Sequence, residues 1–243
     1  MRQATSRSGV EVVLKTAVAS NERRLLHYLS GIKEPSNHTI PLLDVINLSI
    51  EKTILVLPWK SPLDGVLQFR DCPDDVVSLC LQFVEGVAFL HRHNIAHCDL
   101  KPDNVVVDTK SESKSKVSAQ LFIIDLDLAL SVESDETMME GWCGTPPWIA
   151  PEVGSRNGPI QRYSPIRADR WACGQMIEYF AKYFPTYERA QKARLRAFAQ
   201  RLLDVDPRAR PELQGIYGPR KRKAAKIEQS VPKCYEANRC VHY

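Results

Sequence analysis

The chain has 243 residues, 44% of them hydrophobic, with 33 Lys and Arg against 29 Asp and Glu, which gives a net charge of +4. This length allows one large domain or two small lobes with a real core, and the nearly balanced charge excludes a whole-molecule preference for nucleic acid or membranes. No stretch of about 18 apolar residues occurs, and the first residues carry no apolar leader, so we expect a soluble intracellular protein, cytoplasmic or nuclear.

The cysteines number seven, an odd count, and no two of them form a CxxC pair. That pattern fits neither a zinc ribbon nor a secreted disulfide framework. We therefore expect reduced, intracellular thiols.

The first regular element in the pattern is a strand over Glu11–Val18, rich in β-branched and aliphatic residues, with Lys15 in its middle. Ser20 or Asn21 can cap a short helix that follows, with Glu22 in its first turn. An exposed strand lysine is an equally acceptable interpretation of Lys15 by itself.

Two apolar runs follow, Ile40–Leu48 and Thr53–Leu57, and we expect them to form antiparallel strands. The segment Pro58–Pro62 then stops the second strand, because its two prolines fix the backbone and remove hydrogen-bond donors. A boundary between two lobes is predicted there.

The most regular helical pattern runs from Pro73 to Asn94, and it leads directly into His97–Asn104. Within this loop Asp99 can accept a proton, Lys101 can neutralise charge on a phosphoryl group, and Asn104 can ligate Mg²⁺. The alternative is a polar turn between a helix and a strand, since Pro, Asp and Asn are common turn residues.

Two further apolar strands are expected, Val105–Val107 and Leu121–Ile124, joined by a Ser- and Lys-rich segment, Asp108–Gln120, that we interpret as a mobile hairpin loop. The second of these strands leads into Asp125-Leu126-Asp127. A long, strand-poor stretch rich in Gly and Pro comes next, and we expect an extended loop there.

The last third of the chain contains two helical patterns, a largely buried one over Ala168–Phe184 and a basic amphipathic one over Tyr187–Leu203. Residues 214–243 lose this periodicity and include the run Arg220–Lys223. They are expected to form a flexible basic tail.

In this order the motifs resemble the eukaryotic protein kinase family from about Val12 to Pro211. The residues that carry the resemblance are Val13-Leu14-Lys15, Glu22, His97–Asn104, Asp125, Ala150-Pro151-Glu152, Asp169–Gly174 and Arg210. The resemblance implies a two-lobed α+β fold. It would have a reduced β-rich N-lobe at 1–57, a hinge at 58–62 and a mainly helical C-lobe at 63–213.

The resemblance also implies ATP-dependent phosphoryl transfer to Ser or Thr hydroxyls of protein substrates. Asp99 would orient the acceptor hydroxyl, Lys101 would stabilise the γ-phosphoryl group, and Thr145 would contact both. Asn104 and Asp125 would hold Mg²⁺. The position of Lys101 two residues after Asp99 is similar to the serine/threonine branch of the family.

For the nucleotide, the resemblance implies that Lys15 contacts the α and β phosphates and pairs with Glu22. It implies an adenine site formed by the side chains or backbone of Val13, Leu57, Pro58, Lys60 and Val106. Simple core packing is an equally compatible interpretation of the two valines.

The chain departs from the family pattern at several points. Only one glycine, Gly9, precedes Lys15, so we expect two strands and the Gly-rich phosphate lid to be missing, which would reduce nucleotide affinity and rate. Cys98 stands where many members have Arg, and the resemblance then implies activity that does not depend on activation-loop phosphorylation. Asp127 replaces a glycine and adds a carboxylate beside the metal position.

Two spacings also differ. Lys15 and Glu22 are only seven residues apart, so the sequence does not decide whether they form an ion pair. The interval from Gly174 to Arg210 is short for the family, which puts the usual docking helix in doubt. A catalytically weak pseudokinase that binds nucleotide or protein is the main alternative function. A small-molecule phosphotransferase is a third, against which Ala150-Pro151-Glu152 argues. The sequence does not indicate an oligomeric state.

Overall fold

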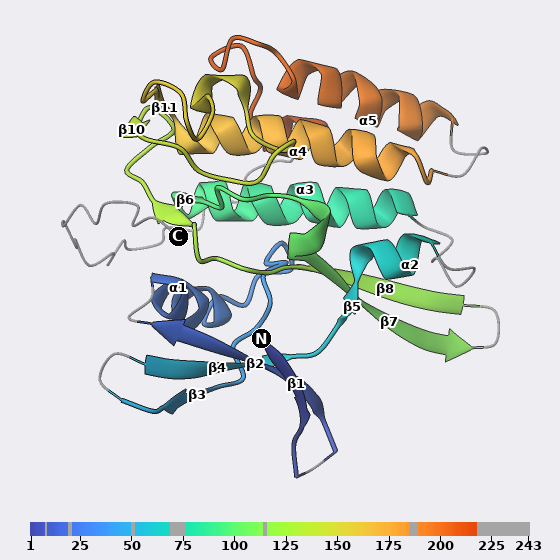
Figure 1. Ribbon diagram of the computed structural model, residues 1–243. Helices are drawn as coiled ribbons and strands as arrows, with labels where there is room; N and C mark the ends of the chain where they lie inside the picture. Colours follow the sequence, from blue (N-terminus) through green and yellow to red (C-terminus); the bar gives the residue numbers. More distant parts are fainter. Residues whose placement is uncertain are drawn as a thin grey trace.

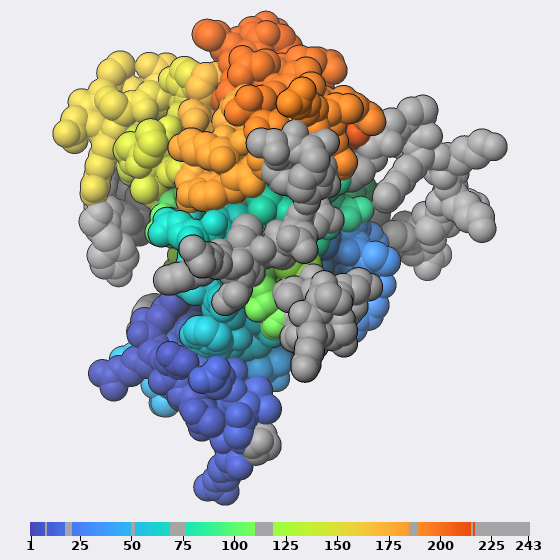
Figure 2. All heavy atoms as spheres, turned by 90° about the vertical axis from the view of Figure 1, so that its right-hand side faces the viewer, coloured from blue at the N-terminus to red at the C-terminus, as the bar shows by residue number. Residues whose placement is uncertain are grey.

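A computed structural model describes residues 1–7, 9–18, 21–49, 52–68, 76–113, 116–184 and 189–217. The described chain has the expected two-lobed α+β fold, with a small sheet and one helix at one end and stacked helices at the other (Figure 1). The space-filling view shows the N-terminal strands and α5 at opposite ends of the molecule (Figure 2). Most of the predicted basic tail, from residue 218 onward, lies outside the described residues.

The N-lobe is a four-stranded antiparallel sheet with the strand order β1-β2-β4-β3. Its strands are β1 (Arg2–Thr5), β2 (Glu11–Val18), β3 (Asp44–Asn47) and β4 (Lys52–Pro58). The predicted bounds of β2 are confirmed. The antiparallel pair after it is also confirmed, although β3 begins at Asp44 and not at Ile40.

The prediction that both strands before Lys15 are missing is wrong. Residues Arg2–Thr5 form β1, which pairs with β2 in the register Arg2 to Leu14 through Thr5 to Glu11. Its sequence, Arg-Gln-Ala-Thr, has no apolar alternation because this edge strand is held by the backbone ladder and buries little side-chain surface.

Helix α1 (Asn21–Ser30) lies against this sheet and carries Glu22 in its first turn. Leu25, Leu26 and Leu29 repeat at helical spacing and are all buried. They pack with Leu55 and Leu57 of β4 in one apolar cluster. The ten-residue helix is therefore fixed by its leucine face, even though it is short.

Between the lobes lie β5 (Ser61–Pro62), α2 (Leu63–Gln68) and a long hairpin of β7 (Val105–Ser113) and β8 (Lys116–Ile123). The prediction of a mobile loop over Asp108–Gln120 is wrong, because the ladder continues from Val105–Ile123 to Ser113–Lys116. Gln82 also fastens β8 to α3, with its amide oxygen 2.9 Å from the Leu121 nitrogen and its amide nitrogen 3.1 Å from the Ala119 oxygen. A polar composition therefore did not identify a loop here.

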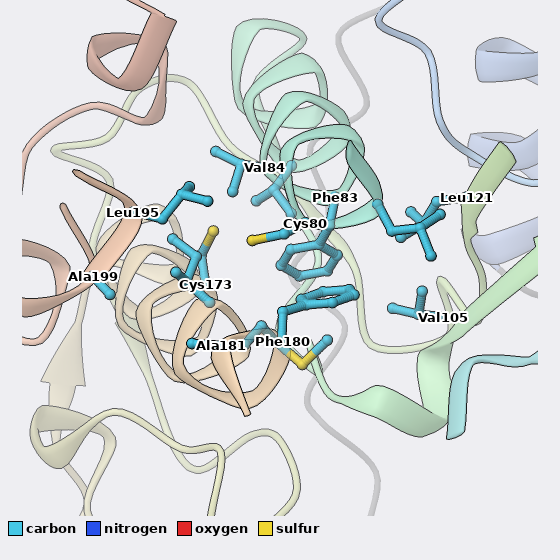
Figure 3. Packing of buried hydrophobic residues seen from close by; sticks show 14 of the residues in the cluster. Cys80, Phe83, Val84, Val105, Leu121, Cys173, Phe180, Ala181, Leu195 and Ala199 are labelled. Carbon is cyan, nitrogen blue, oxygen red and sulfur yellow. The ribbon is translucent and has the colours of Figure 1, made fainter. Parts of the chain in front are cut away.

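The C-lobe is a stack of three helices, α3 (Val76–Arg92), α4 (Pro165–Ala181) and α5 (Arg189–Leu202). Figure 3 shows Phe83 of α3 and Phe180 of α4 facing each other, with ring centroids 6.1 Å apart. Cys80 and Cys173 lie beside them, fully buried in the same cluster. The loop His97–Asn104 rests on this core through Leu100, which belongs to the same cluster.

The three predicted C-lobe helices exist, with shifted ends. Residues 69–75, with the predicted start of α3, are outside the described part, as are residues 185–188 before α5. Helix α4 begins three residues earlier than predicted, because the Ser164 hydroxyl accepts from the Arg167 backbone nitrogen and Pro165 takes the first helical position.

Helix α3 approaches its neighbours unusually closely at Gly86. A Cβ there would lie 2.9 Å from both the His38 Cβ and the Ile123 Cδ1, so only glycine fits. The backbone of His38 also pairs with that of Ile123, at 2.7 Å. This contact joins the chain between α1 and β3 to the C-lobe.

The stretch after β8 is extended, as predicted, with only short elements. These are β9 (Leu130–Ser131), β10 (Met139–Glu140), which pairs with β11 (Arg162–Tyr163), and the 3₁₀ turn η2 (Pro151–Val153). Strand β9 pairs with β6 (Ile95–Ala96), which lies before β7 in the chain, as does the 3₁₀ turn η1 (Pro102–Asn104). A further 3₁₀ turn, η3 (Leu213–Tyr217), packs against α3 where the tail was expected to begin.

In the described part of the chain, α5 is the one helix between α4 and Arg210, in agreement with the doubt about a docking helix. None of the helices described is long and apolar enough to span a membrane.

Candidate active site

The catalytic loop, His97–Asn104, is braced from below by Asp169 of α4. The Asp169 carboxylate is 2% exposed and accepts from the backbone nitrogens of His97, at 2.6 Å, and Cys98, at 2.9 Å. Cys98 has a φ of 65°, a left-handed conformation that costs a non-glycine residue about 1–3 kcal/mol. The two hydrogen bonds offset this strain, and Asp169 takes the bracing position that the family resemblance implied.

Asp99 lies at the centre of a hydrogen-bonded cluster. Its Oδ2 accepts from Lys101 Nζ at 2.7 Å and from Asn104 Nδ2 at 3.0 Å. Its Oδ1 accepts from Thr145 Oγ1 at 2.7 Å, and Lys101 Nζ also donates to that hydroxyl at 2.7 Å. The four predicted residues therefore meet, although Thr145 is 46 positions from Asp99 in the chain.

Gly144 lets Thr145 come this close. Its φ is 104°, and a Cβ would lie 3.1 Å from the Cys98 carbonyl oxygen. That conformation is one that side-chain-bearing residues rarely adopt. The glycine therefore allows the segment before Thr145 to lie directly on the catalytic loop.

Lys15 of β2 is buried and contacts three carboxylates. Its Nζ lies 2.8 Å from Glu22, 2.7 Å from Asp125 Oδ1 and 2.9 Å from Asp127 Oδ2. The ion pair with Glu22, in the first turn of α1, therefore forms despite the short spacing.

The pKa values of this cluster reflect burial and mutual contact. Burial works to lower the pKa of Lys15, but the Glu22 and Asp125 carboxylates outweigh it and raise the value above the ordinary one. Burial and a hydrogen bond with Asp127 raise the pKa of Glu22 to about 7, against the opposing effect of Lys15. Burial also works to raise the pKa of Asp125, yet the hydrogen bond from Lys15 leaves it below its usual value.

Asp125 and Asn104 carry the side-chain oxygens to which the family resemblance assigns Mg²⁺. Asp125 has a φ of 65° and its carboxylate faces Lys15, while the next residue, Leu126, is fully buried under α1. The Asn104 amide nitrogen donates to the Asp99 carbonyl oxygen at 2.8 Å and to its side chain, so the amide oxygen is left as the group that can face a metal. A carboxylate with an amide oxygen is a donor set that suits Mg²⁺.

The predicted adenine residues lie on the strands that flank the lobe boundary. Val13 of β2 stands opposite Leu57 of β4, and Val106 of β7 stands opposite Pro62 of β5. Both valines are half-buried and pack on one apolar cluster, so core packing and a purine surface remain compatible.

Pro58 ends β4, and Lys60 follows it in the segment between the lobes. The Lys60 ammonium pairs with Asp108 at 2.7 Å. It therefore points toward β7, and its backbone nitrogen is the part of Lys60 that the resemblance assigns to adenine.

The activation segment, Asp125–Glu152, is held by two arginines that the sequence interpretation did not assign. Arg170 Nη2 lies 3.0 Å from Asp135 Oδ2, and Arg167 pairs with Glu136. Both arginine side chains are 9% exposed. The sequence did contain a signal for these contacts, a pair of arginines three residues apart at the start of a helix predicted to be buried, because buried arginines require partners.

The segment ends in a buried bidentate pair. Arg210 Nη1 and Nη2 lie 2.6 Å and 2.8 Å from the two Glu152 oxygens. Arg210 also donates to the Asp204 carbonyl oxygen at 2.9 Å and to that of Arg167 at 2.8 Å. The pairing that the resemblance implied is therefore present in this chain.

Comparison with known proteins identifies the family. The protein kinase domain model matches residues 62–218. CBL-interacting serine/threonine-protein kinase 13 of Arabidopsis thaliana is 36% identical over 185 residues, which cover 72% of this chain and 33% of the relative. Putative CBL-interacting protein kinase 13 of Oryza sativa subsp. japonica is 28% identical over 74% of this chain and 33% of its own length.

A further relative is the probable serine/threonine-protein kinase fhkE of Dictyostelium discoideum, 30% identical over 60% of this chain and 23% of its own length. The chain thus spans about a third or less of the length of these relatives. The family model covers more than half of the chain. The chain belongs to the protein kinase family.

Proposed function

We propose that this chain transfers the γ-phosphoryl group of ATP to Ser or Thr hydroxyls of protein substrates. The observation that carries the proposal is the closed cluster of Asp99, Lys101 and Thr145, with three contacts of 2.7 Å. Such a cluster holds a general base and a cation at fixed positions, which is what phosphoryl transfer requires from a protein.

In this proposal each member of the cluster has a separate task. The Asp99 carboxylate, oriented by Thr145 and Asn104, accepts the proton of the acceptor hydroxyl. The Lys101 ammonium neutralises charge on the moving phosphoryl group. A general base of this kind contributes about 10²–10⁴-fold to a rate.

The nucleotide would lie between the lobes, with residues 58–62 as the hinge. Lys15, fixed by Glu22, would bind the α and β phosphates, and Asn104 and Asp125 would hold Mg²⁺. MgATP supplies the phosphoryl group and a cation that neutralises its oxygens. The half-buried Val13 and Val106, with Leu57, Pro58 and the Lys60 backbone, would bind adenine.

The test is transfer of labelled γ-phosphate to a mixed protein substrate by the full 243-residue chain, with and without Mg²⁺. We expect Mg²⁺-dependent transfer that Asp99→Asn and Asp125→Asn reduce by at least about 10²-fold. Asp103→Asn is the matched control, because Asp103 is an exposed carboxylate of the same loop and should keep the activity. Thermal melting of each variant verifies its folding.

A second candidate is a nucleotide- or protein-binding module without turnover. The contact of Asp127 with Lys15 favours it, because that carboxylate stands at the proposed phosphate-binding ammonium. A folded chain that binds MgADP but transfers no phosphate to any protein would support the module and exclude the kinase reaction.

A further inference from the structure

Asp127 occupies the solvent side of the Lys15 ammonium. Its Oδ2 lies 2.9 Å from Lys15 Nζ, against 2.8 Å for Glu22 and 2.7 Å for Asp125, the two carboxylates already assigned to that lysine. The Asp127 side chain is 50% exposed, against 28% for Asp125 and 1% for Glu22. It is thus the member of the cluster nearest to water.

The three carboxylates use the full donor capacity of the lysine. An ammonium has three N–H donors, and one carboxylate stands at hydrogen-bonding distance for each. A phosphate oxygen that approaches Lys15 must therefore displace one of them. Glu22 is buried and also accepts from the Leu126 backbone nitrogen at 3.1 Å, so it is fixed. Asp127 is the carboxylate that can leave.

Displacement alone does not remove the conflict. Oxygens of Glu22, Asp125 and Asp127 lie within 4.8 Å of one another around a single ammonium, which leaves the cluster with excess negative charge. A displaced Asp127 carboxylate stays on the short chain after Asp125 and would face the incoming phosphates. Like charges at such distances repel strongly in a half-buried site, unless a cation lies between them.

We propose that Asp127 competes with nucleotide phosphates for Lys15, so that this site accepts a nucleotide together with a divalent cation and disfavours the free nucleotide anion. The inference rests on the proposed nucleotide site and adds a specificity determinant to it. A glycine, the family residue at this position, could not make this contact, because it has no side chain. Asp127 therefore strengthens, in this chain, the cation dependence that the proposed Mg²⁺ ligands Asn104 and Asp125 already give the site.

The experiment measures the affinity of the full chain for ADP and ATP by titration calorimetry, once with Mg²⁺ and once with EDTA. Asp127→Asn removes the charge and keeps the shape. We expect it to raise affinity in EDTA by about tenfold and to change affinity in Mg²⁺ much less. Asp127→Glu, which keeps the charge, should retain the wild-type difference between the two conditions. Asp127→Ser serves as a second neutral variant if Asp127→Asn does not fold.

Asp103→Asn is again the matched control, since it removes one exposed carboxylate elsewhere in the site region. Equal affinities of wild type and Asp127→Asn in EDTA would overturn the inference and leave the proposed function standing. An equal gain from Asp103→Asn would also overturn it, because the effect would then be one of net charge. Folded variants that bind no nucleotide under either condition would overturn the proposed function and this inference with it.

Discussion

Arg210 offers the sharpest test of how the activation segment is held. Its side chain is fully buried and bridges Glu152 to the Asp204 and Arg167 carbonyl oxygens. Arg210→Ala would leave the Glu152 carboxylate, 15% exposed, without a cation and two carbonyl oxygens without a donor. Removal of one partner from a buried pair costs about 3–5 kcal/mol of the free energy of unfolding.

For a domain of this size, 1 kcal/mol corresponds to about 2–4 °C in Tm, so Arg210→Ala should lower Tm by roughly 6–20 °C. The Tm of Arg210→Lys should lie between those of the wild type and Arg210→Ala, because lysine keeps the charge but lacks the planar guanidinium that binds both Glu152 oxygens. Calorimetry or circular dichroism melting measures the shifts.

The control for this prediction is Arg92→Ala. Arg92 faces Glu34 at 3.4 Å, but the two side chains are 36% and 38% exposed, and such surface pairs contribute at most about 1 kcal/mol. A Tm shift for Arg210→Ala no larger than that for Arg92→Ala would refute the reasoning. A double variant with Glu152→Gln should lose less than the two single variants together, since the pair acts as a unit.

Three other predictions follow from buried or half-buried groups. Phosphatase treatment should leave phosphoryl transfer unchanged, and loss of activity after the treatment would contradict this prediction. Arg170→Ala, which removes the buried partner of Asp135, should reduce phosphoryl transfer and speed proteolysis of the activation segment. Arg162→Ala, which breaks the exposed pair with Glu140, should change neither the transfer nor the proteolysis. Burial lowers the pKa of His93 below 6.5, so the unfolded chain binds more protons at this residue than the folded chain does. The stability that neutral His93 contributes is therefore lost as pH falls through its folded-state pKa. Urea denaturation from pH 8 to pH 5 should show a smaller loss of the free energy of unfolding for His93→Gln than for the wild type. Burial raises the pKa of the Cys80 and Cys173 thiols, so iodoacetamide at pH 8 should label them in the folded chain more slowly than Cys98 and Cys143, the other two cysteines among the described residues. Equal labelling of these four thiols would be inconsistent with the core.

Much of the fold was predictable because the pattern was local. The bounds of β2 and the existence of α1, α3, α4 and α5 follow from apolar periodicity, and the residues of the catalytic loop are contiguous. The pattern failed where backbone pairing, and not side-chain burial, holds the chain. The strand β1 and the outer part of the β7–β8 hairpin, Asp108–Gln120, are polar in sequence, so their ladders could not be seen in composition.

Short motifs are enough to recognise which chemical groups this protein carries and in what order, among them Asp99, Lys101, Asn104 and Asp125. Which of those groups share a site became visible in the folded chain alone. The convergence of Glu22, Asp125 and Asp127 on Lys15, and of Asp135 and Glu136 on two arginines of α4, joins residues far apart in the chain. Such contacts depend on how helices and strands pack in space, and sequence spacing carries no direct record of that packing.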